Sequence, residues 1–287
     1  MQDILNAGLS PEEIDRRFEA SGERMTTPCY DGDMVWRVWG EGPPLVLLHG
    51  GYGSWRHWIK NIGPLSQRRR VFVADNPGLG DSASVPLPHS GEKLAAVIVE
   101  GIDQIIPVPE RFDLVGFSFG GLLGGHVASM MGDRVRNLVV IAPGGLGIAR
   151  TTERPPLAKI RPHMSEQELV DAHRHNLSVI MFHHAEKIDD LALYLQQETV
   201  KRARVKSPLI ARTDTLARVL PNITANMNAI YGEMDDATGD GLERRQALFR
   251  SIHPEIDFRV IDGAGHWVMY ETPEIFNKMV QEMIGRE

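Results

Sequence analysis

A serine flanked by glycines offers the clearest chemistry in this 287-residue chain. An apolar run ends in Gly116-Phe117-Ser118-Phe119-Gly120, and a helix-like stretch follows. This spacing at the end of a strand indicates a strained turn that exposes the serine hydroxyl, because the glycines leave room for neighbouring backbone. The following helix and the Phe119 N–H would face a developing oxyanion. We predict that Ser118 is a nucleophile; the alternative is a tight glycine-rich connection without a catalytic role.

A nucleophilic serine needs a base, and eleven histidines are available. His266 follows the last apolar strand-like run in Gly263-Ala264-Gly265-His266-Trp267, where glycines free the backbone to point the imidazole at Ser118. Asp235 follows the preceding strand-like run, so the chain order is Ser, Asp, His. We predict His266 as the base and Asp235 as the acid that orients it, with Asp236 and Glu233 as alternatives for the acid.

A second glycine-rich loop, His49-Gly50-Gly51-Tyr52-Gly53, directly follows another apolar run. At the carboxyl end of a parallel strand, this loop would lie beside Ser118. It can present a second oxyanion-binding N–H, which we assign to Gly51, with Tyr52 as the alternative. A phosphate cradle is disfavoured because no Gly-Lys-Ser/Thr follows.

The composition narrows the class of protein. Lys and Arg total 31 against 38 Asp and Glu, without a dense basic tract, so nucleic acid is not an expected partner. The first twenty residues lack the apolar region of a signal peptide, and no apolar run approaches a membrane span. The single cysteine, Cys29, cannot form an internal disulfide. We therefore expect a cytoplasmic protein with Cys29 as a buried free thiol.

Strand-like and helix-like runs alternate along the chain, which predicts an α/β fold. It has a mostly parallel central sheet, helices on both faces and an inserted helical cap. The expected strands span residues 34–39, 45–49, 71–75, 112–117, 137–142, 228–231 and 257–261. The core comprises 1–143 and 222–287, with a peripheral N-terminal helix within 1–24 that begins at Ser10. Residues 144–221 contain no convincing strand, so they form the cap, in which Ser165-Glu166-Gln167-Glu168 predicts a capped helix start.

Together these motifs, with Asp75-Asn76-Pro77-Gly78-Leu79-Gly80-Asp81-Ser82, resemble those of the α/β-hydrolase superfamily, in its serine-nucleophile branch with a helical cap. The resemblance runs from about residue 25 to the C-terminus. The segment 265–277 is similar to that of meta-cleavage-product hydrolases, which cut carbon–carbon bonds in vinylogous diketones. In those enzymes a cap arginine binds the substrate carboxylate; here Arg174, Arg202 and Arg204 are candidates, without a unique match.

Two further sequence patterns could indicate a dinucleotide site and a metal site. Gly78-Leu79-Gly80-Asp81-Ser82-Ala83 matches a dinucleotide fingerprint, but Pro77, Pro86 and Pro88 prevent a helix from starting where the pyrophosphate would need one. Five cap histidines invite a metal-site hypothesis, but no carboxylate or cysteine completes a ligand spacing. They are His163, His173, His175, His183 and His184. We expect neither a metal nor a cofactor.

The expected activity is that of a serine hydrolase that acts on a carboxylic ester or similar small acyl substrate through an acyl-enzyme. Carbon–carbon hydrolysis with the same three residues is the alternative, and a non-catalytic receptor is a further one. The substrate, with an apolar acyl group, should bind between cap and sheet. The candidate lining residues are Tyr52, Trp55, Phe119, Met181, Phe182 and Trp267. The expected partner is thus a small molecule, with homo-oligomers left open.

Overall fold

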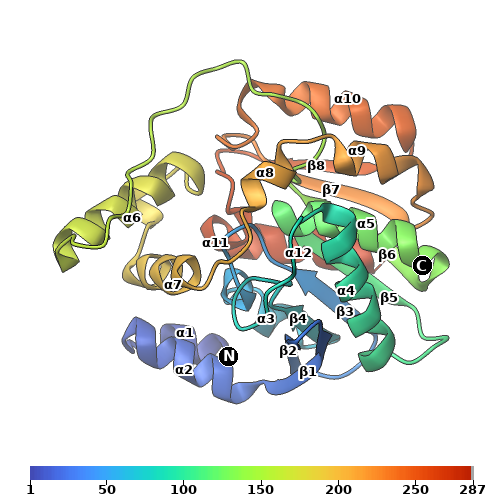
Figure 1. Ribbon diagram of the computed structural model, residues 1–287, viewed down its shortest axis with the longest axis horizontal. Helices are drawn as coiled ribbons and strands as arrows, with labels where there is room; N and C mark the ends of the chain where they lie inside the picture. The colour runs from blue at the N-terminus through green and yellow to red at the C-terminus, as the bar shows by residue number, and fades with distance from the viewer. Residues whose placement is uncertain (286–287) are drawn as a thin grey trace.

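The computed structural model describes residues 1–285 and contains one eight-stranded sheet (Figure 1). The strands are β1 (Glu23–Cys29), β2 (Gly32–Trp39), β3 (Pro44–Leu48), β4 (Arg70–Ala74), β5 (Phe112–Phe117), β6 (Val135–Ile141), β7 (Asn226–Gly232) and β8 (Asp257–Ile261). Their order is β1-β2-β4-β3-β5-β6-β7-β8. The β1–β2 and β2–β4 pairs are antiparallel, and all other neighbours are parallel. The predicted fold class is therefore confirmed.

The strand β1 was missing from the predicted set. Its residues alternate between buried and exposed only weakly, and it contains Pro28, which disfavours an interior strand position. It pairs on one side only, at the edge of the sheet, where proline is tolerated. Cys29 at its end is a buried free thiol, and burial raises its pKa.

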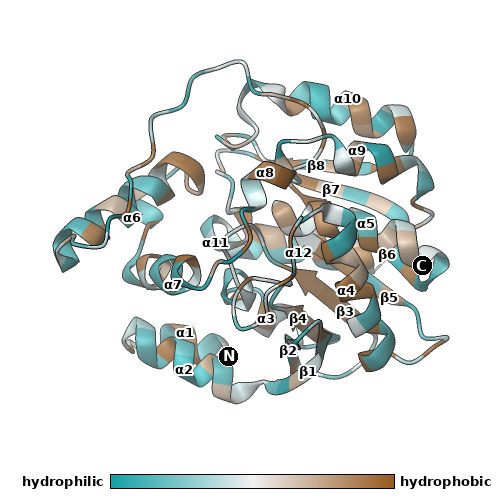
Figure 2. Cartoon of the chain, in the orientation of Figure 1, coloured by the Kyte–Doolittle hydropathy of each residue, from teal (hydrophilic) through white to brown (hydrophobic). Residues whose placement is uncertain are grey.

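Helices cover both faces of the sheet because successive side chains on the central strands point to opposite sides. In β3, Val46 and Leu48 pack with one hydrophobic core, whereas Leu45 and Leu47 pack with the other. The central strands are accordingly the most apolar part of the ribbon in Figure 2. The helices over the first face are α4 (Gly91–Ile105), α5 (Phe119–Met131) and α10 (Leu242–Ile252). Those over the second face are α2 (Pro11–Ser21), α3 (Ile62–Leu65), α11 (Val268–Glu271) and α12 (Pro273–Ile284).

The segment between β6 and β7, residues 144–221, is called the insertion here; it contains helices and no strand. Its helices are α6 (Glu166–Ile180), α7 (Asp190–Lys201), α8 (Ser207–Ala211) and α9 (Thr215–Val219). Ser165 and Glu168 form the predicted capping box at the start of α6. Figure 1 shows a long strand-free connection that leads from the sheet to α6. The division into a core and a separate cap stays a prediction.

The N-terminal segment is less peripheral than the sequence indicated. After the short helix α1 (Gln2–Asn6), α2 begins after the N-cap Ser10 and buries Ile14 and Phe18. The buried carboxylate of Asp15 accepts two hydrogen bonds from Arg56, at 2.7 and 2.9 Å, and a third from the Tyr194 hydroxyl of α7 at 3.2 Å. The helix α2 therefore joins the sheet side of the molecule to the insertion.

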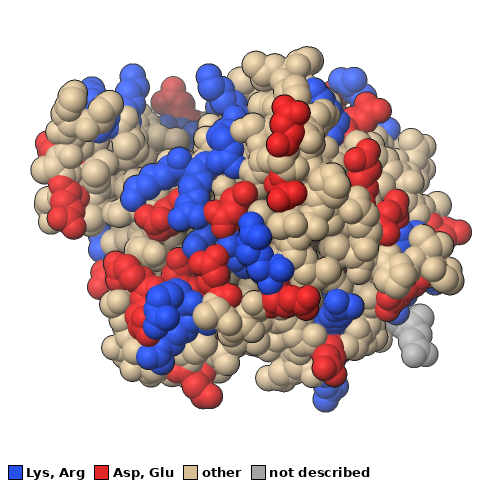
Figure 3. All heavy atoms as spheres, turned by 60° about the horizontal axis from the view of Figure 1, so that its bottom comes forward, with Lys and Arg blue, Asp and Glu red and all other residues tan. Residues whose placement is uncertain are grey.

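Short 3₁₀ turns complete the described chain: η1 (Trp55–Trp58), η2 (Gly132–Arg134), η3 (Ala185–Lys187), η4 (Leu220–Asn222) and η5 (Gly239–Gly241). Among residues 1–285, no helix combines the length and apolar character needed to cross a bilayer. On the face shown in Figure 3, Lys and Arg side chains are flanked by Asp and Glu side chains. The charge on this face is thus mixed rather than uniformly basic.

Candidate active site

Ser118 lies in the sharp turn between β5 and α5. Its backbone has φ 52° and ψ −110°, a conformation that non-glycine residues adopt only under strain. The turn is tight because a Cβ on Gly116 would lie 2.3 Å from the Gly120 carbonyl oxygen, and one on Gly120 would lie 2.2 Å from that of Leu48. The two glycines of the motif are thus required for the strand and helix to approach each other. The serine hydroxyl is left at the carboxyl edge of the sheet, where it lines a large cavity.

His266 and Asp235 meet at the same edge, on the loops after β8 and β7. His266 Nδ1 lies 2.8 Å from Asp235 Oδ2, and both side chains are buried. An ionised carboxylate only accepts, so Nδ1 carries the proton and donates it to Asp235. The other ring nitrogen is then free to accept a proton, and His266 lines the same cavity as Ser118.

The charge on Asp235 is stabilised within this buried setting. Burial by itself raises the pKa of a carboxyl group, but the charge and hydrogen bond of His266 and two hydrogen bonds from Thr238 outweigh it. Thr238 donates its backbone N–H at 3.1 Å and its hydroxyl at 3.0 Å. The net result is that the pKa of Asp235 lies below its ordinary value.

The two alternative acids have other partners. The Asp236 carboxylate pairs with Arg150 at 2.8 Å, and Glu233 accepts the Gly263 N–H at 2.9 Å. Neither contacts His266 through a hydrogen bond among residues 1–285. The geometry therefore favours Asp235 as the partner of the histidine.

The glycine-rich loop after β3 is held by two buried histidines. His49 Nδ1 lies 2.7 Å from the Gly50 carbonyl oxygen, while its Nε2 accepts the Asn76 N–H at 2.9 Å. Because that carbonyl and the Gly51 N–H belong to one peptide group, the hydrogen bond fixes the direction of the Gly51 N–H. Neither this N–H nor that of Phe119 has a hydrogen-bond acceptor within residues 1–285. Both residues line the cavity.

His57 was not predicted from the sequence, yet it lies in this site. Its Nδ1 accepts the Gly50 N–H at 3.3 Å, so the proton of the neutral ring is on Nε2. The ring packs against Phe117 and Trp267, with centroids 5.7 and 5.0 Å away. Burial, together with the neighbouring His49 and His266, places the pKa of His57 well below its ordinary value. The ring is therefore hard to protonate, which makes it a poor general base. The segment Trp55-Arg56-His57-Trp58 gave no sign that its histidine would lie in the site.

The large cavity has a volume of about 960 Å³ and lies between the sheet edge and the insertion. Of the predicted lining residues, Tyr52, Phe119 and Met181 line it, while Trp55, Phe182 and Trp267 do not. Trp55 is fully buried between Arg37 and Arg56, with their guanidinium carbons 5.1 and 5.0 Å from its ring centroid. Trp267 is buried against Tyr270, at a centroid distance of 4.4 Å. These tryptophans belong to the core rather than the pocket wall, so that part of the pocket expectation is corrected.

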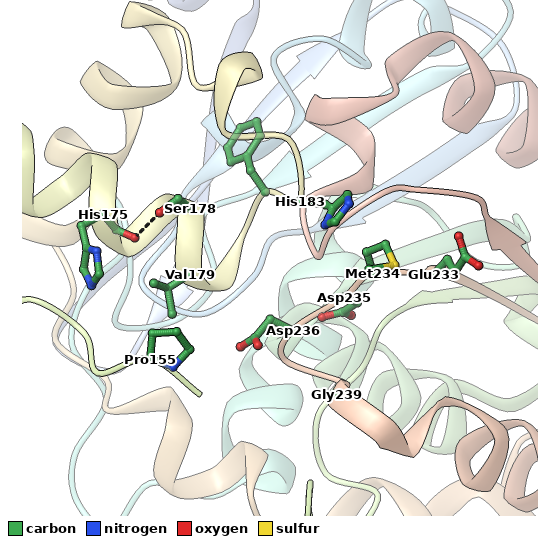
Figure 4. Close-up of a pocket in the computed structure, with 11 residues that line it drawn as sticks. Pro155, His175, Ser178, Val179, His183, Glu233, Met234, Asp235, Asp236 and Gly239 are labelled. Atoms are coloured by element: carbon green, nitrogen blue, oxygen red, sulfur yellow. Dashed lines mark hydrogen bonds between the residues drawn. The ribbon is translucent and has the colours of Figure 1, made fainter. Parts of the chain in front are cut away.

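A smaller cavity of about 570 Å³ is lined by Asp235 and its neighbours in the loop after β7 (Figure 4). It opens between His175 and Ser178 of α6 and the acidic loop after β7, and it does not include Ser118. Among residues 1–285, no three His, Cys, Asp or Glu side chains are grouped as a metal site would require. His175 contacts the Pro156 carbonyl oxygen at 2.8 Å.

A buried glutamate ties the His266 loop to the insertion. The Glu271 carboxylate accepts the N–H groups of Gly265 and His184, each at 2.7 Å, and that of His183 at 3.4 Å. The Trp267 N–H donates to the Met181 carbonyl oxygen at 2.8 Å. The sequence-based assignment missed Glu271, and its only signal was an acid in the otherwise apolar run Val268-Met269-Tyr270-Glu271.

The arginines of the insertion fall into two groups. Arg202 pairs with Asp81 at 2.5 Å, and Arg204 donates to the Gly80 and Ser82 carbonyl oxygens. Arg174 donates to the Ile188 carbonyl oxygen at 2.9 Å. None of these three lines the large cavity, whereas Arg150, Arg154 and Arg212 do. Arg202 and Arg204 therefore connect the insertion to the loop after β4.

The matching family model is described as the alpha/beta hydrolase family, and it covers residues 45–279. This chain belongs to that family. The chain is 25% identical over 261 residues to a 2-hydroxy-6-oxononadienedioate/2-hydroxy-6-oxononatrienedioate hydrolase of Comamonas testosteroni, which covers 86% of this chain and 89% of that protein.

Other similar proteins are named as esterases. A pimeloyl-[acyl-carrier protein] methyl ester esterase of Vibrio vulnificus is 29% identical over 266 residues, covering 88% of this chain and 99% of the relative. Among solved structures, a carboxylesterase from Bacillus subtilis superposes with a TM-score of 0.74, at 19% identity and with 100% of both chains covered. The last likeness is one of fold alone.

Proposed function

We propose that this protein is a serine hydrolase in which Ser118, His266 and Asp235 form the catalytic triad, and that it cleaves a small carboxylic ester or similar acyl substrate. The observation that carries the proposal is the 2.8 Å contact between His266 and Asp235, on the edge of a cavity that Ser118 also lines. The relatives named as esterases support the same class of reaction.

The mechanism follows from the roles of these side chains. His266 takes the proton of the Ser118 hydroxyl while its oxygen attacks the substrate carbonyl carbon, and Asp235 stabilises the imidazolium. The Gly51 and Phe119 N–H groups donate to the oxyanion. His266 then passes the proton to the leaving group, and the resulting acyl-enzyme is cleaved by a water that His266 deprotonates. The chemistry needs no cofactor.

The cavity supports a small-molecule substrate with an apolar acyl group. Leu146, Ile148, Leu157 and Ile180 give it apolar walls, and its volume of about 960 Å³ lies within the range of small-molecule sites. The insertion, proposed as a cap, closes it opposite the sheet edge. Oligomerisation and a cytoplasmic location stay predictions.

Carbon–carbon bond hydrolysis is the second candidate, because relatives of similar identity are named as dienoate and dienedioate hydrolases. Their substrates bear carboxylates, which a fixed cation would match. In this chain Arg212 is the candidate: it lines the cavity, and its side chain has no ion-pair partner within residues 1–285.

The test compares kcat/KM for a short-chain aryl ester and for a dienoate diketone, with the wild type and Ser118→Ala. We expect the ester to be the better substrate and Ser118→Ala to lower turnover by several orders of magnitude for either. A better rate on the diketone would replace the esterase proposal by carbon–carbon hydrolysis with the same triad. Full turnover by Ser118→Ala would reject the triad itself.

A further inference from the structure

Ser207, at the start of α8 in the insertion, lies against the loop that carries Gly51. Its side chain is buried, with 2% of the residue exposed, and it lines the large cavity together with Gly51 and Ser118. A Cβ built on Gly51 would lie 2.2 Å from Ser207 Oγ, so the hydroxyl occupies the space next to the Gly51 backbone. A hydroxyl from the insertion thus reaches the proposed oxyanion site.

Within residues 1–285 the Ser207 hydroxyl has no hydrogen-bond partner. Its oxygen is not one of the fully buried polar atoms that lack a partner, so it is accessible from the cavity that Ser207 lines. Among residues 1–285 no histidine or carboxylate is hydrogen-bonded to Ser207, so the serine has no base that would activate it as a second nucleophile. A group that binds in the cavity is the remaining partner for the hydroxyl.

The backbone on both sides of Ser207 is held by hydrogen bonds, upstream to the loop after β4 and downstream to the first residues after β6. Upstream, the Arg204 N–H donates to the Gly78 carbonyl oxygen at 2.9 Å. Downstream, the Gly145 N–H donates to the Ala211 carbonyl oxygen at 2.7 Å. The backbone that carries the hydroxyl is therefore held in place before any substrate arrives, as electrostatic stabilisation of a transition state requires.

The surroundings of Gly51 identify which atom the hydroxyl would meet. The point that a Gly51 Cβ would occupy is also 3.7 Å from Phe119 Cβ, so Gly51, Phe119 and Ser207 converge. Gly51 and Phe119 are the residues whose free N–H groups are proposed to bind the oxyanion. We infer that Ser207 donates its O–H to the oxyanion, as a third donor that the insertion supplies. This inference rests on the proposed function. The proton remains on Ser207, and no bond to it is made or broken.

The test uses Ser207→Ala in the full chain, with Ser178→Ala as the matched control. Ser178 is also in the insertion, donates its hydroxyl to the His175 carbonyl oxygen at 2.8 Å and faces the smaller cavity. For a short-chain aryl ester, we expect Ser207→Ala to lower kcat about 10- to 100-fold with little change in KM, a milder loss than that of a fixed backbone-like donor because a hydroxyl rotates. Ser178→Ala should match the wild type.

A second measurement separates an oxyanion role from a packing role. A trifluoromethyl ketone adds to Ser118 to form a charged hemiketal oxygen, whereas the matching alcohol fills the cavity without forming one. Ser207→Ala should weaken the ketone by the same factor as kcat/KM and leave binding of the alcohol unchanged. Unchanged kinetics, or equal weakening of both ligands, would overturn the assignment. If Ser118→Ala is inactive while Ser207→Ala equals the wild type, only the Ser207 assignment fails; if Ser118→Ala is fully active, the proposed function fails first.

Discussion

The two walls of the large cavity are built in different ways. At the sheet edge, Ser118, Asp235 and His266 each follow a strand within a few residues, and hydrogen bonds to neighbouring strand ends hold their loops. In the insertion, positions are set by contacts between segments far apart in the chain, such as Arg202 with Asp81. On the proposed function, the first wall carries the reacting groups, and the second wall selects the substrate and adds Ser207 as an oxyanion donor. Apart from Ser207, turnover and substrate selectivity should therefore respond to mutations in different walls.

Asp235→Asn should produce the largest effect, because it removes the charge opposite the His266 imidazolium and disturbs the ring tautomer. We expect kcat to fall by roughly 10⁴-fold while the protein stays folded. Asp236→Asn is the control: its partner is Arg150, and its carboxylate is partly exposed, so we expect less than about a threefold change. Steady-state kinetics on an aryl ester measure both, and equal effects would mean that the histidine takes its acid from elsewhere.

Glu271→Gln probes the junction between the two walls. The Glu271 carboxylate accepts three backbone N–H groups with two oxygens, whereas a glutamine side chain has one oxygen. The NH₂ group of the glutamine would face a backbone N–H, and two donors cannot form a hydrogen bond. We expect kcat to fall about tenfold and the thermal midpoint to drop by about 3–8 °C. Glu274→Gln, exposed on the adjacent helix, should leave both unchanged. A wild-type rate in Glu271→Gln would show that the His266 loop does not depend on the insertion.

Two buried histidines near the sheet edge should make the free energy of unfolding depend on pH. Burial lowers the pKa of His49 and His57 below the ordinary value of 6.5, so both are neutral in the fold and gain protons on unfolding. Below about pH 6.5 the unfolded chain binds more protons, and the free energy of unfolding falls as pH decreases. Each histidine contributes at most about 1.4 kcal/mol per pH unit.

Urea unfolding between about pH 7.5 and 5 measures this dependence. His57→Gln should give a flatter profile than the wild type, whereas exposed His163→Gln should not. Parallel profiles for all three proteins would mean that His57 titrates alike in the folded and unfolded states.

The arginines give the smallest expected effect on ester turnover. Arg202→Ala and Arg204→Ala should change kcat/KM for an apolar aryl ester less than about threefold, because neither side chain lines the cavity. Arg212→Ala should also have little effect on kcat/KM for this ester, but it should raise KM about tenfold for an ester that bears a carboxylate. Kinetics with the two esters test this, and a selective loss in Arg202→Ala instead would reassign the cation.

The same contrast explains what the sequence could predict. Ser118, Gly51 and His266 stand in short motifs whose glycines are dictated by local backbone geometry, so their placement follows from a few neighbouring residues. The mostly parallel sheet follows from the alternation of strands and helices.

The residues that the sequence missed depend on contacts between distant segments. Ser207 is an ordinary serine before Pro208 until α8 is placed against Gly51, and Arg212 differs from Arg202 only in what lies opposite it. Trp55 and Trp267 were assigned to the pocket because aromatic residues suit both a pocket and a core, and only packing decides between them.

The central claim is that Ser118 is the nucleophile, and covalent labelling tests it most directly. The wild-type protein would be treated with a fluorophosphonate at neutral pH and digested, and the modified peptide located by mass spectrometry. We predict one equivalent of label on Ser118, loss of ester turnover in proportion to labelling, and no label at this site in Ser118→Ala. A stoichiometric adduct on another serine, with Ser118 unmodified and turnover abolished, would contradict it.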